Sequence, residues 1–228
     1  MATTTTATFN MDFTEIAEEA WERAGREMHS GYDLRTARRS MNLLTIEWQN
    51  RGINMWTIEE GTVALTSGVA TVDLPDDTVD LLEHTLRTNA GNATTQNDLT
   101  LTRISVSTYA TIPNKLSQGR PIQLMINRGR DTPVVTVWPV PDKTGYSINY
   151  YRIRRIQDAG AGVFTADMNF RFLPCLVAGL AYYIAMKVPE LAPRVPMLKE
   201  IYNEQFTLAA NEDREKASVR FVPRIGHP

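Results

Sequence analysis

The chain has little of the chemistry that builds disulfides or metal sites. Its 228 residues include one cysteine and three histidines. The single Cys175 excludes a disulfide or a cysteine-ligated zinc ion within one chain, and its apolar neighbours place it in a core. His29, His84 and His227 are far apart, and none belongs to an H-x-x-x-H or H-E-x-x-H pattern that would bring two imidazoles to one metal. We therefore expect no metal site.

The chain also has no apolar run long enough to cross a bilayer. Residues 172–186 are free of charge, but these 15 residues fall short of the roughly 20 that a spanning helix needs. The beginning, "MATTTTATFNMDF", has neither the basic nor the apolar region of a signal peptide. We expect residues 1–11 to form a flexible arm, and we expect no membrane partner.

The whole chain has almost no excess of one sign of charge, but two of its segments do. The formal net charge is −2, yet residues 1–83 carry 15 acidic and 6 basic side chains, and residues 84–157 carry 3 acidic and 10 basic. The balance is not basic enough for a dedicated nucleic-acid binder. The split predicts either opposite patches that meet neighbouring molecules, or strands that carry arginine on a solvated face.

Helical spacing is present at the beginning of the chain. In "DFTEIAEEAWERAG", Asp12 and Glu15 form the capping-box pattern, and Gly25 is a plausible end. A second helix is predicted over residues 33–52, with an apolar stripe at spacings of three and four. The two stripes predict a helical hairpin in which these helices face each other.

The middle of the chain shows a period near two. Runs such as "PIQLMINR", "PVVTVWP" and "YSINYYRIRR", separated by turn residues, predict six to eight short strands. Residues 142–145, "DKTG", predict a hairpin between the last two strands, because the glycine can adopt a positive φ. Residues 56–157 are therefore interpreted as an all-β domain resembling a sandwich or a barrel.

Helical spacing returns after residue 157. "LPCLVAGLAYYIAMKVPE" and "PMLKEIYNEQFTLAANEDREKA" predict two further helices. Helices at both ends predict an α+β fold in which residues 12–55 and 158–218 form a four-helix bundle and the β domain is inserted into it. Residues 219–228 contain two prolines, a glycine and several apolar side chains, and they predict an extended C-terminal tail that needs a partner.

No motif predicts catalysis or a bound cofactor. In "PNKLSQGRP", residues 113–121, Lys115 precedes Gly119, so the order required of a phosphate-binding G-x-x-x-x-G-K-[ST] loop is absent. The two prolines instead predict a stiff connection between strands, with Lys115 and Arg120 pointing outward. Gly160 and Gly162 form only a lone G-x-G, which we assign to a loop.

Several stretches, in their order along the chain, resemble the head-to-tail adaptor proteins of short-tailed bacteriophages, also called gateway or tail tubular A proteins. These stretches are "SMNLLTIEWQNRGINMW", "PNKLSQGRP", "VTVWPVPD", "YYRIRRIQDAG", "LPCLVAGLAYYIAMKVPE" and "ANEDREKAS". Each one is largely a packing or turn signature, so their shared order carries the resemblance. It covers about residues 10–225.

The resemblance implies a structural protein of the virion neck, assembled in the host cytoplasm. Its partners would be further copies of itself in a ring, usually of twelve, the portal protein above, and the tail nozzle and fibres or spikes below, with the genome passing through the channel. The tail residues that would meet the portal are Arg220, Phe221, Val222, Arg224 and Ile225. The basic residues that would face the channel or a partner are Lys115, Arg120, Arg128, Arg130, Arg152 and Arg154.

Two other functions stay open at this point. A wall-degrading hydrolase would need two facing carboxylates in a cleft, although Asp76, Asp77 and Asp80 are placed like turn and cap residues. A DNA-binding protein would need its arginines on one surface and binding that weakens steeply with salt. Alternation along "YYRIRRI" places Arg152 and Arg154 on one face and Arg155 on the other.

Overall fold

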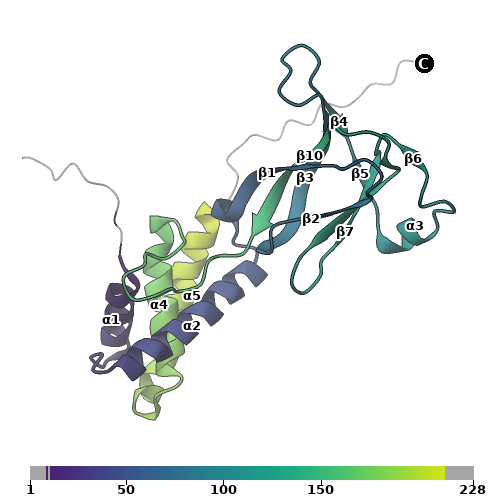
Figure 1. Cartoon of the computed structure of the whole chain (residues 1–228). Coiled ribbons are helices and arrows are strands. Elements are labelled where there is room, and N and C mark those ends of the chain that lie inside the picture. The colour runs from purple at the N-terminus through teal and green to yellow at the C-terminus, as the bar shows by residue number, and fades with distance from the viewer. Residues whose placement is uncertain (1–8, 10, 214–228) are drawn as a thin grey trace, which may run out of the picture. The chain divides into compact units, whose positions relative to one another are not determined.

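The computed structural model describes residues 9 and 11–213, so the C-terminal tail lies outside the described residues. The chain divides into two compact units. The helical unit comprises the chain up to Met55 together with the chain from Gln157 onward, and the β unit comprises Trp56–Ile156. Figure 1 shows helices at both ends of the chain and strands between them, so the α+β prediction is confirmed.

Four helices and two short 3-10 segments build the helical unit. The bounds are α1 (Phe13–Ala24), α2 (Gly31–Asn50), η2 (Phe170–Phe172), α4 (Leu173–Ala185), η3 (Pro189–Arg194) and α5 (Val195–Glu212). Helix α4 packs against α1, α2 and α5. It can do so because it is apolar almost all round, which is typical of a helix covered on every side.

The beginning and the end of α1 follow the sequence prediction. The Asp12 carboxylate accepts a hydrogen bond from the Glu15 backbone N–H at 2.9 Å, and the Glu15 carboxylate accepts one from the Asp12 N–H at 2.9 Å. Gly25 ends the helix with φ of 103°, a conformation that only glycine adopts readily. The capping box and the stop are both confirmed.

The predicted pairing of the first two helices is wrong in its main contact. Helix α1 packs chiefly against α4, and α2 also packs more extensively against α4 than against α1. The apolar stripes of α1 and α2 both pack against α4, because α4 has a wider apolar surface than either of these two helices. The arrangement of the four helices as a bundle stays a prediction.

The β unit contains ten strands and one short helix. Their bounds are β1 (Ile58–Ala64), β2 (Thr71–Asp73), β3 (Thr78–Thr88), β4 (Asn97–Thr100), β5 (Thr102–Arg103), α3 (Val106–Ala110), β6 (Gln118–Gly119), β7 (Gln123–Asn127), β8 (Val134–Trp138), β9 (Val140–Pro141) and β10 (Tyr146–Arg154), preceded by the 3-10 segment η1 (Met55–Thr57). One four-stranded sheet has the order β1-β10-β3-β4 and the other β2-β8-β7-β5, while β6 pairs with β9.

One hydrophobic core serves both larger sheets. It takes side chains such as Leu86 and Ile148 from β3 and β10, and Leu124 and Val135 from β7 and β8. The strand orders of both sheets are open at their ends, so the barrel-like alternative is wrong for the described strands. The sandwich stays a prediction.

Two predicted connections differ from the structure. Residues 142–145 do not close a hairpin, because β9 pairs with β6 whereas β10 pairs with β1 and β3. Gly145 does adopt a positive φ of 96°, so the turn signal was right and only the strand partner was wrong. Residues 113–121 join α3 to β7 and include β6; α3 has no buried residue, so it leaves no periodic signal in the sequence.

Candidate interaction surfaces

The described part of the chain holds no metal-ligand cluster, and its cysteine is buried. No group of three or more His, Cys, Asp or Glu residues that could hold a metal occurs among residues 9 and 11–213. Cys175 is buried, and burial raises the pKa of its thiol to about 12, so the reactive thiolate is scarce at neutral pH. None of the described helices is both long and apolar enough to span a membrane.

Arg152 and Arg154 are held inside an ion-pair network on β10. Arg152 Nη2 lies 2.9 Å from Glu59 Oε2, and its Nη1 contacts Asp77. Arg154 Nε lies 2.7 Å from Glu59 Oε1. Both arginines contact Glu59, so they lie on one face of the sheet, as the alternation predicts. Their side chains are only 11% and 12% exposed, because carboxylates from neighbouring segments pack against them.

The electrostatic effect of this network appears in Asp77. Hydrogen bonding from Arg152 lowers the pKa of the Asp77 carboxyl below its ordinary value, so the acid stays ionised at neutral pH. An ionised carboxylate held by arginine is a poor proton donor. The neighbouring candidate acids are also engaged, since Asp80 pairs with Arg103 at 2.9 Å and Asp76 accepts from Thr132 Oγ1 at 2.8 Å.

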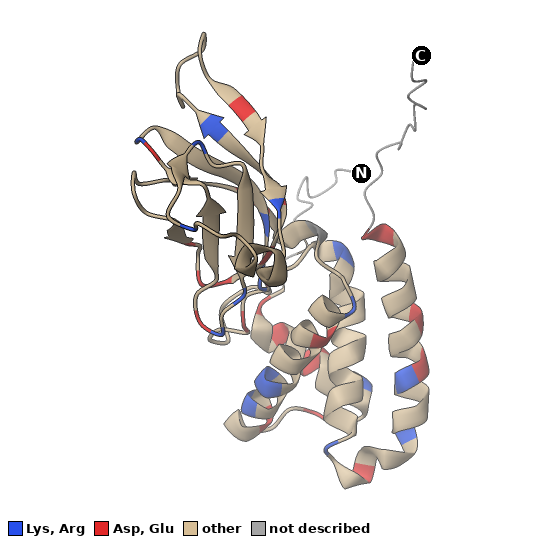
Figure 2. Cartoon of the chain, turned by 90° about the vertical axis from the view of Figure 1, so that its right-hand side faces the viewer, with Lys and Arg blue, Asp and Glu red and all other residues tan. Residues whose placement is uncertain are grey.

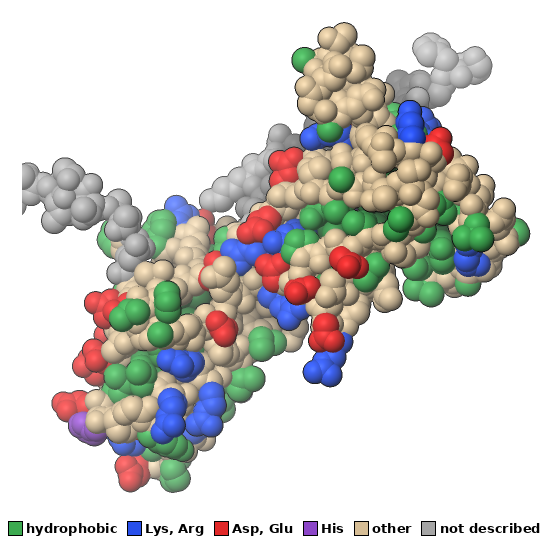
Figure 3. Space-filling view, in the orientation of Figure 1, with side chains coloured by type: hydrophobic (Ala, Val, Ile, Leu, Met, Phe, Trp, Pro, Cys, Tyr) green, Lys and Arg blue, Asp and Glu red, His purple; other side chains and the backbone are tan. Residues whose placement is uncertain are grey.

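The other predicted basic residues are more exposed. Arg128 lies 3.5 Å from Asp80 with its side chain 63% exposed, and Arg130 is 95% exposed beside Asp131. Acidic and basic side chains lie next to one another over the β unit (Figure 3). Much of the charge split seen along the sequence is therefore paired within this unit, since acids of the first segment meet arginines of the second.

Lys115 and Arg120, which both lie in the loop after α3, have different surroundings. The Lys115 ammonium donates to the backbone carbonyls of Ala110 at 3.2 Å and Ile112 at 3.1 Å, so it closes the end of α3 although its side chain is exposed. Arg120 is exposed and lines a pocket of about 470 Å³ together with Lys143 and Tyr146. Of the two, Arg120 is the more available to a partner.

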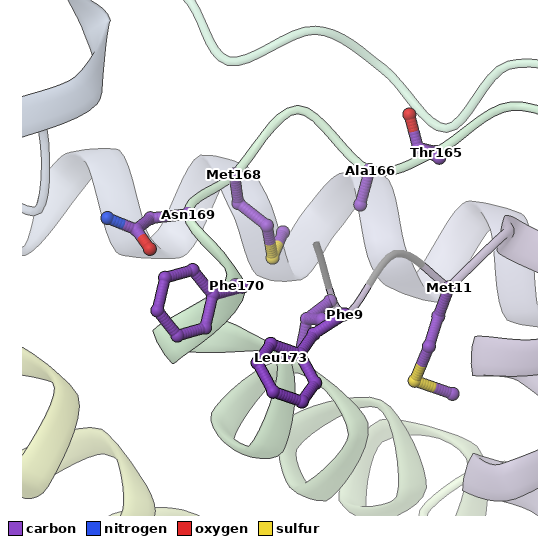
Figure 4. A pocket seen from close by; sticks show the side chains of 8 residues that line it. All are labelled: Phe9, Met11, Thr165, Ala166, Met168, Asn169, Phe170 and Leu173. Atoms are coloured by element: carbon purple, nitrogen blue, oxygen red, sulfur yellow. The ribbon is translucent and has the colours of Figure 1, made fainter. Parts of the chain in front are cut away.

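An apolar groove opens on the helical unit, and sequence reasoning missed it. It is lined by Phe9, Met11, Phe170, Arg171, Leu173 and Pro174 and has a volume of about 540 Å³. A more polar hollow of about 210 Å³, which Thr165 and Asn169 also line, shares several of these residues. Figure 4 shows Phe9, Phe170 and Leu173 gathered at one side of the hollow. The Phe9 and Phe170 rings stack with centroids 5.8 Å apart. The aromatic residues in "FTADMNFRFLP" were the available signal, but that stretch reads as a loop.

Two helices present mixed apolar and charged outer faces. We call the first the α2 face; its members Arg35, Arg39, Leu43 and Ile46 recur at spacings of three and four and are exposed. We call the second the α5 face, and its exposed members are Met197, Glu200, Ile201, Glu204 and Leu208. Figure 2 shows acidic residues recurring along α5, the helix that leads into the grey C-terminal trace. One face is apolar and basic, and the other is apolar and acidic.

The described residues thus form an α+β fold that exposes an apolar groove and two mixed apolar and charged helix faces. Residues 11–224, nearly the whole chain, match the SU10 adaptor protein family, and the chain belongs to this family of bacteriophage head-to-tail adaptors. A comparison with curated proteins finds no match. The predicted tail residues Arg220, Phe221, Val222, Arg224 and Ile225 fall outside the described residues, so their role stays a prediction.

Proposed function

We propose that this protein is the head-to-tail adaptor of the virion neck, forming a ring under the portal and carrying the tail nozzle. The observation that carries the proposal is the family match over residues 11–224. The two units act as separate domains in this proposal, the helical one for ring assembly and the β one for tail components.

The ring is proposed to form by contact between the α2 face of one copy and the α5 face of the next. Two different surfaces on one molecule make a heterologous contact, and such contacts generate rings when the rotation closes. The apolar members, Leu43 and Ile46 on one side and Ile201 and Leu208 on the other, would be buried. The opposite charges would fix which face meets which. The proposed ring has twelve copies.

The C-terminal tail is proposed to bind the portal. Residues 219–225, "VRFVPRI", combine two arginines with apolar side chains and a proline, which suits an extended segment entering a groove between portal subunits. A segment that orders on binding loses chain entropy, so it needs large apolar anchors. Phe221 and Ile225 are the proposed anchors, and Arg220 and Arg224 would pair with acidic groups beside them.

The β unit is proposed to meet the nozzle and the fibres or spikes, while the genome passes through the ring without sequence-specific contact. Among the basic residues assigned to partners or the channel, Arg120, Arg128 and Arg130 are exposed enough to serve. Arg152 and Arg154 are neutralised by Glu59 and Asp77, so we assign them to the structure of the sheet. Lys115 belongs with them because it closes α3.

Binding to purified portal tests this function. Light scattering of the full chain mixed with portal should report a large complex, and Phe221→Ser with Ile225→Ser should abolish it. Leu116→Ser, at a residue 83% exposed in the β unit, is the matched control and should bind as the parent does. If the portal shows no complex with the unaltered chain, or if the tail variant binds equally well, the assignment of the tail is wrong.

A further inference from the structure

Among the residues that the structure describes, the apolar groove leaves two aromatic rings exposed. Phe9 is 67% exposed and Phe170 is 47% exposed, although each ring would gain by leaving water. The larger hollow, of about 540 Å³, is lined by apolar side chains except for Arg171. Its size is that of a site for a few large side chains rather than for a whole helix.

Helix α5 ends beside this groove. Its last residue, Glu212, places Oε2 at 2.7 Å from Nη1 of Arg171, and Arg171 itself lines the groove. Asp213 then accepts a hydrogen bond from the Asn54 backbone N–H at 3.0 Å. The chain therefore leaves the described part of the helical unit beside the groove.

We propose that the groove binds residues 219–225 of the same chain, with Phe221 and Ile225 inserted, and that this contact holds the tail until the portal takes it. Phe221 follows Asp213 by eight residues, and an extended chain of that length reaches up to about 26 Å. Pro223 favours an extended backbone at Val222, which is the form that a narrow groove accepts. The portal step rests on the proposed function, but the groove contact does not.

Other occupants fit less well. Residues 1–8, "MATTTTAT", precede Phe9 in the sequence, but they are rich in threonine and carry no aromatic side chain. A second copy could supply its own tail, yet a tethered segment acts at an effective concentration in the millimolar range. At micromolar protein concentration, the tail of the same chain should therefore occupy the groove more often than the tail of a second copy.

Cysteine cross-linking of the full chain tests the contact without portal. Met11→Cys combined with Ile225→Cys should form a disulfide within one molecule under mild oxidation, seen as a faster band on a non-reducing gel. Ile225→Cys alone controls for Cys175, which is 1% exposed, and Leu116→Cys with Ile225→Cys controls for random collision. Covalent dimers would assign the groove to a second copy, and a yield no higher than the collision control would show that the tail does not bind there; either result overturns the proposal.

A variant whose groove no longer binds the tail should then bind portal more tightly. Phe170→Asp should abolish the cross-link while leaving the thermal unfolding of the helical unit nearly unchanged, because Phe170 is half exposed. If the tail occupies the groove for nine-tenths of the time, freeing it raises the apparent affinity for portal about tenfold. An unchanged affinity would contradict the holding role. If no protein in the series binds portal, but Met11→Cys with Ile225→Cys still forms its internal disulfide, the proposed function alone is contradicted.

Discussion

At the scale of single residues, Gly179 shows how closely the helices of the helical unit pack. It lies in the middle of α4, where a Cβ would stand 2.8 Å from Leu44 Cδ2 and 2.9 Å from Tyr202 Cε2. Both neighbours are buried, and Tyr202 also accepts a hydrogen bond from Trp48 Nε1 at 3.0 Å. The missing side chain is what allows α2 and α5 to approach α4 at this point.

Gly179→Ala should therefore destabilise the protein although alanine favours helix. Overpacking a filled core costs about 1–3 kcal/mol, and the helix-propensity gain of about 1 kcal/mol offsets only part of it, so we expect a net loss of up to about 2 kcal/mol. Urea unfolding followed by circular dichroism measures the difference. Gly31→Ala in α2 is the matched control, because nothing lies within 4 Å of its Cβ position, and it should leave stability equal or raise it. Equal effects of the two substitutions would show that α4 has room to spare.

His84 on β3 predicts a pH dependence at the same scale. Burial, followed by the charge of Arg103, lowers the pKa of its imidazole below the ordinary 6.5. The unfolded chain then takes up a proton near pH 6.5, whereas the folded chain takes it up only at lower pH. The stability from this group is thus complete above pH 6.5 and is lost as the pH falls through the folded pKa.

The measurement is the free energy of unfolding at several pH values from 7.5 to 5. The unaltered chain should lose stability across this interval, and His84→Gln should lose distinctly less. The Asp77 carboxyl does not interfere, because its pKa is lowered below 3.8 and its contribution disappears only in more acidic solution. Identical pH slopes for the two proteins would mean that His84 titrates in the folded state as it does in the unfolded chain.

At the scale of secondary-structure elements, Arg152 joins three segments of the β unit. It lies on β10 and contacts Glu59 on β1 and Asp77 in the turn before β3. Arg152→Met keeps much of the stem but leaves Asp77 without its arginine, while Glu59 keeps its contact with Arg154. Loss of a buried partner costs several kcal/mol, yet these acids are 42% and 47% exposed, so we expect a loss of about 1–2 kcal/mol.

Arg130→Met is the control for that prediction. Its side chain is 95% exposed, and exposed substitutions usually change stability by no more than about 0.5 kcal/mol. Denaturant unfolding of both variants compares the buried Arg152 with the exposed Arg130. A destabilisation of Arg152→Met no larger than that of Arg130→Met would mean that the network contributes little to the sheet.

The elements also show which features a sequence can predict. The ends of α1 were predictable because Asp12, Glu15 and Gly25 act through local hydrogen bonds and local φ. The partner of β10 was not, because Gly145 determines only that the chain turns and not which strand edge it meets. The groove was missed for the same reason. Phe9 and Phe170 are 161 residues apart, and only tertiary packing brings their rings together.

At the scale of the whole molecule, the charge split along the sequence has two fates. Within the β unit, acids of β1 and β3 are paired with arginines of β5 and β10. On the helical unit, Arg35 and Arg39 of the α2 face and Glu200 and Glu204 of the α5 face have no ion-pair partner within 4 Å among the residues that the structure describes. These four charges remain available to neighbouring copies.

Reversing the charge of one face at a time should reveal whether the faces meet. In the acidic variant, Arg35→Glu and Arg39→Glu make both faces acidic, and in the basic variant, Glu200→Lys and Glu204→Lys make both faces basic. Each variant alone should assemble on portal at least about tenfold more weakly, because like charges across a contact cost several kcal/mol. Glu18→Lys, on the exposed side of α1, is the control and should assemble normally.

Mixing the two variants gives the decisive result. The acidic α2 face of one variant then meets the basic α5 face of the other, and the reverse contact is complementary as well, so an alternating ring should form and light scattering should recover. Higher salt should weaken this recovery, since the pairs are exposed. If each face instead met its own kind across a two-fold axis, the unaltered chain would already bring like charges together, and neither variant alone should assemble more weakly than the parent. Failure of the mixture to assemble, with both variants folded, would contradict the α2–α5 contact.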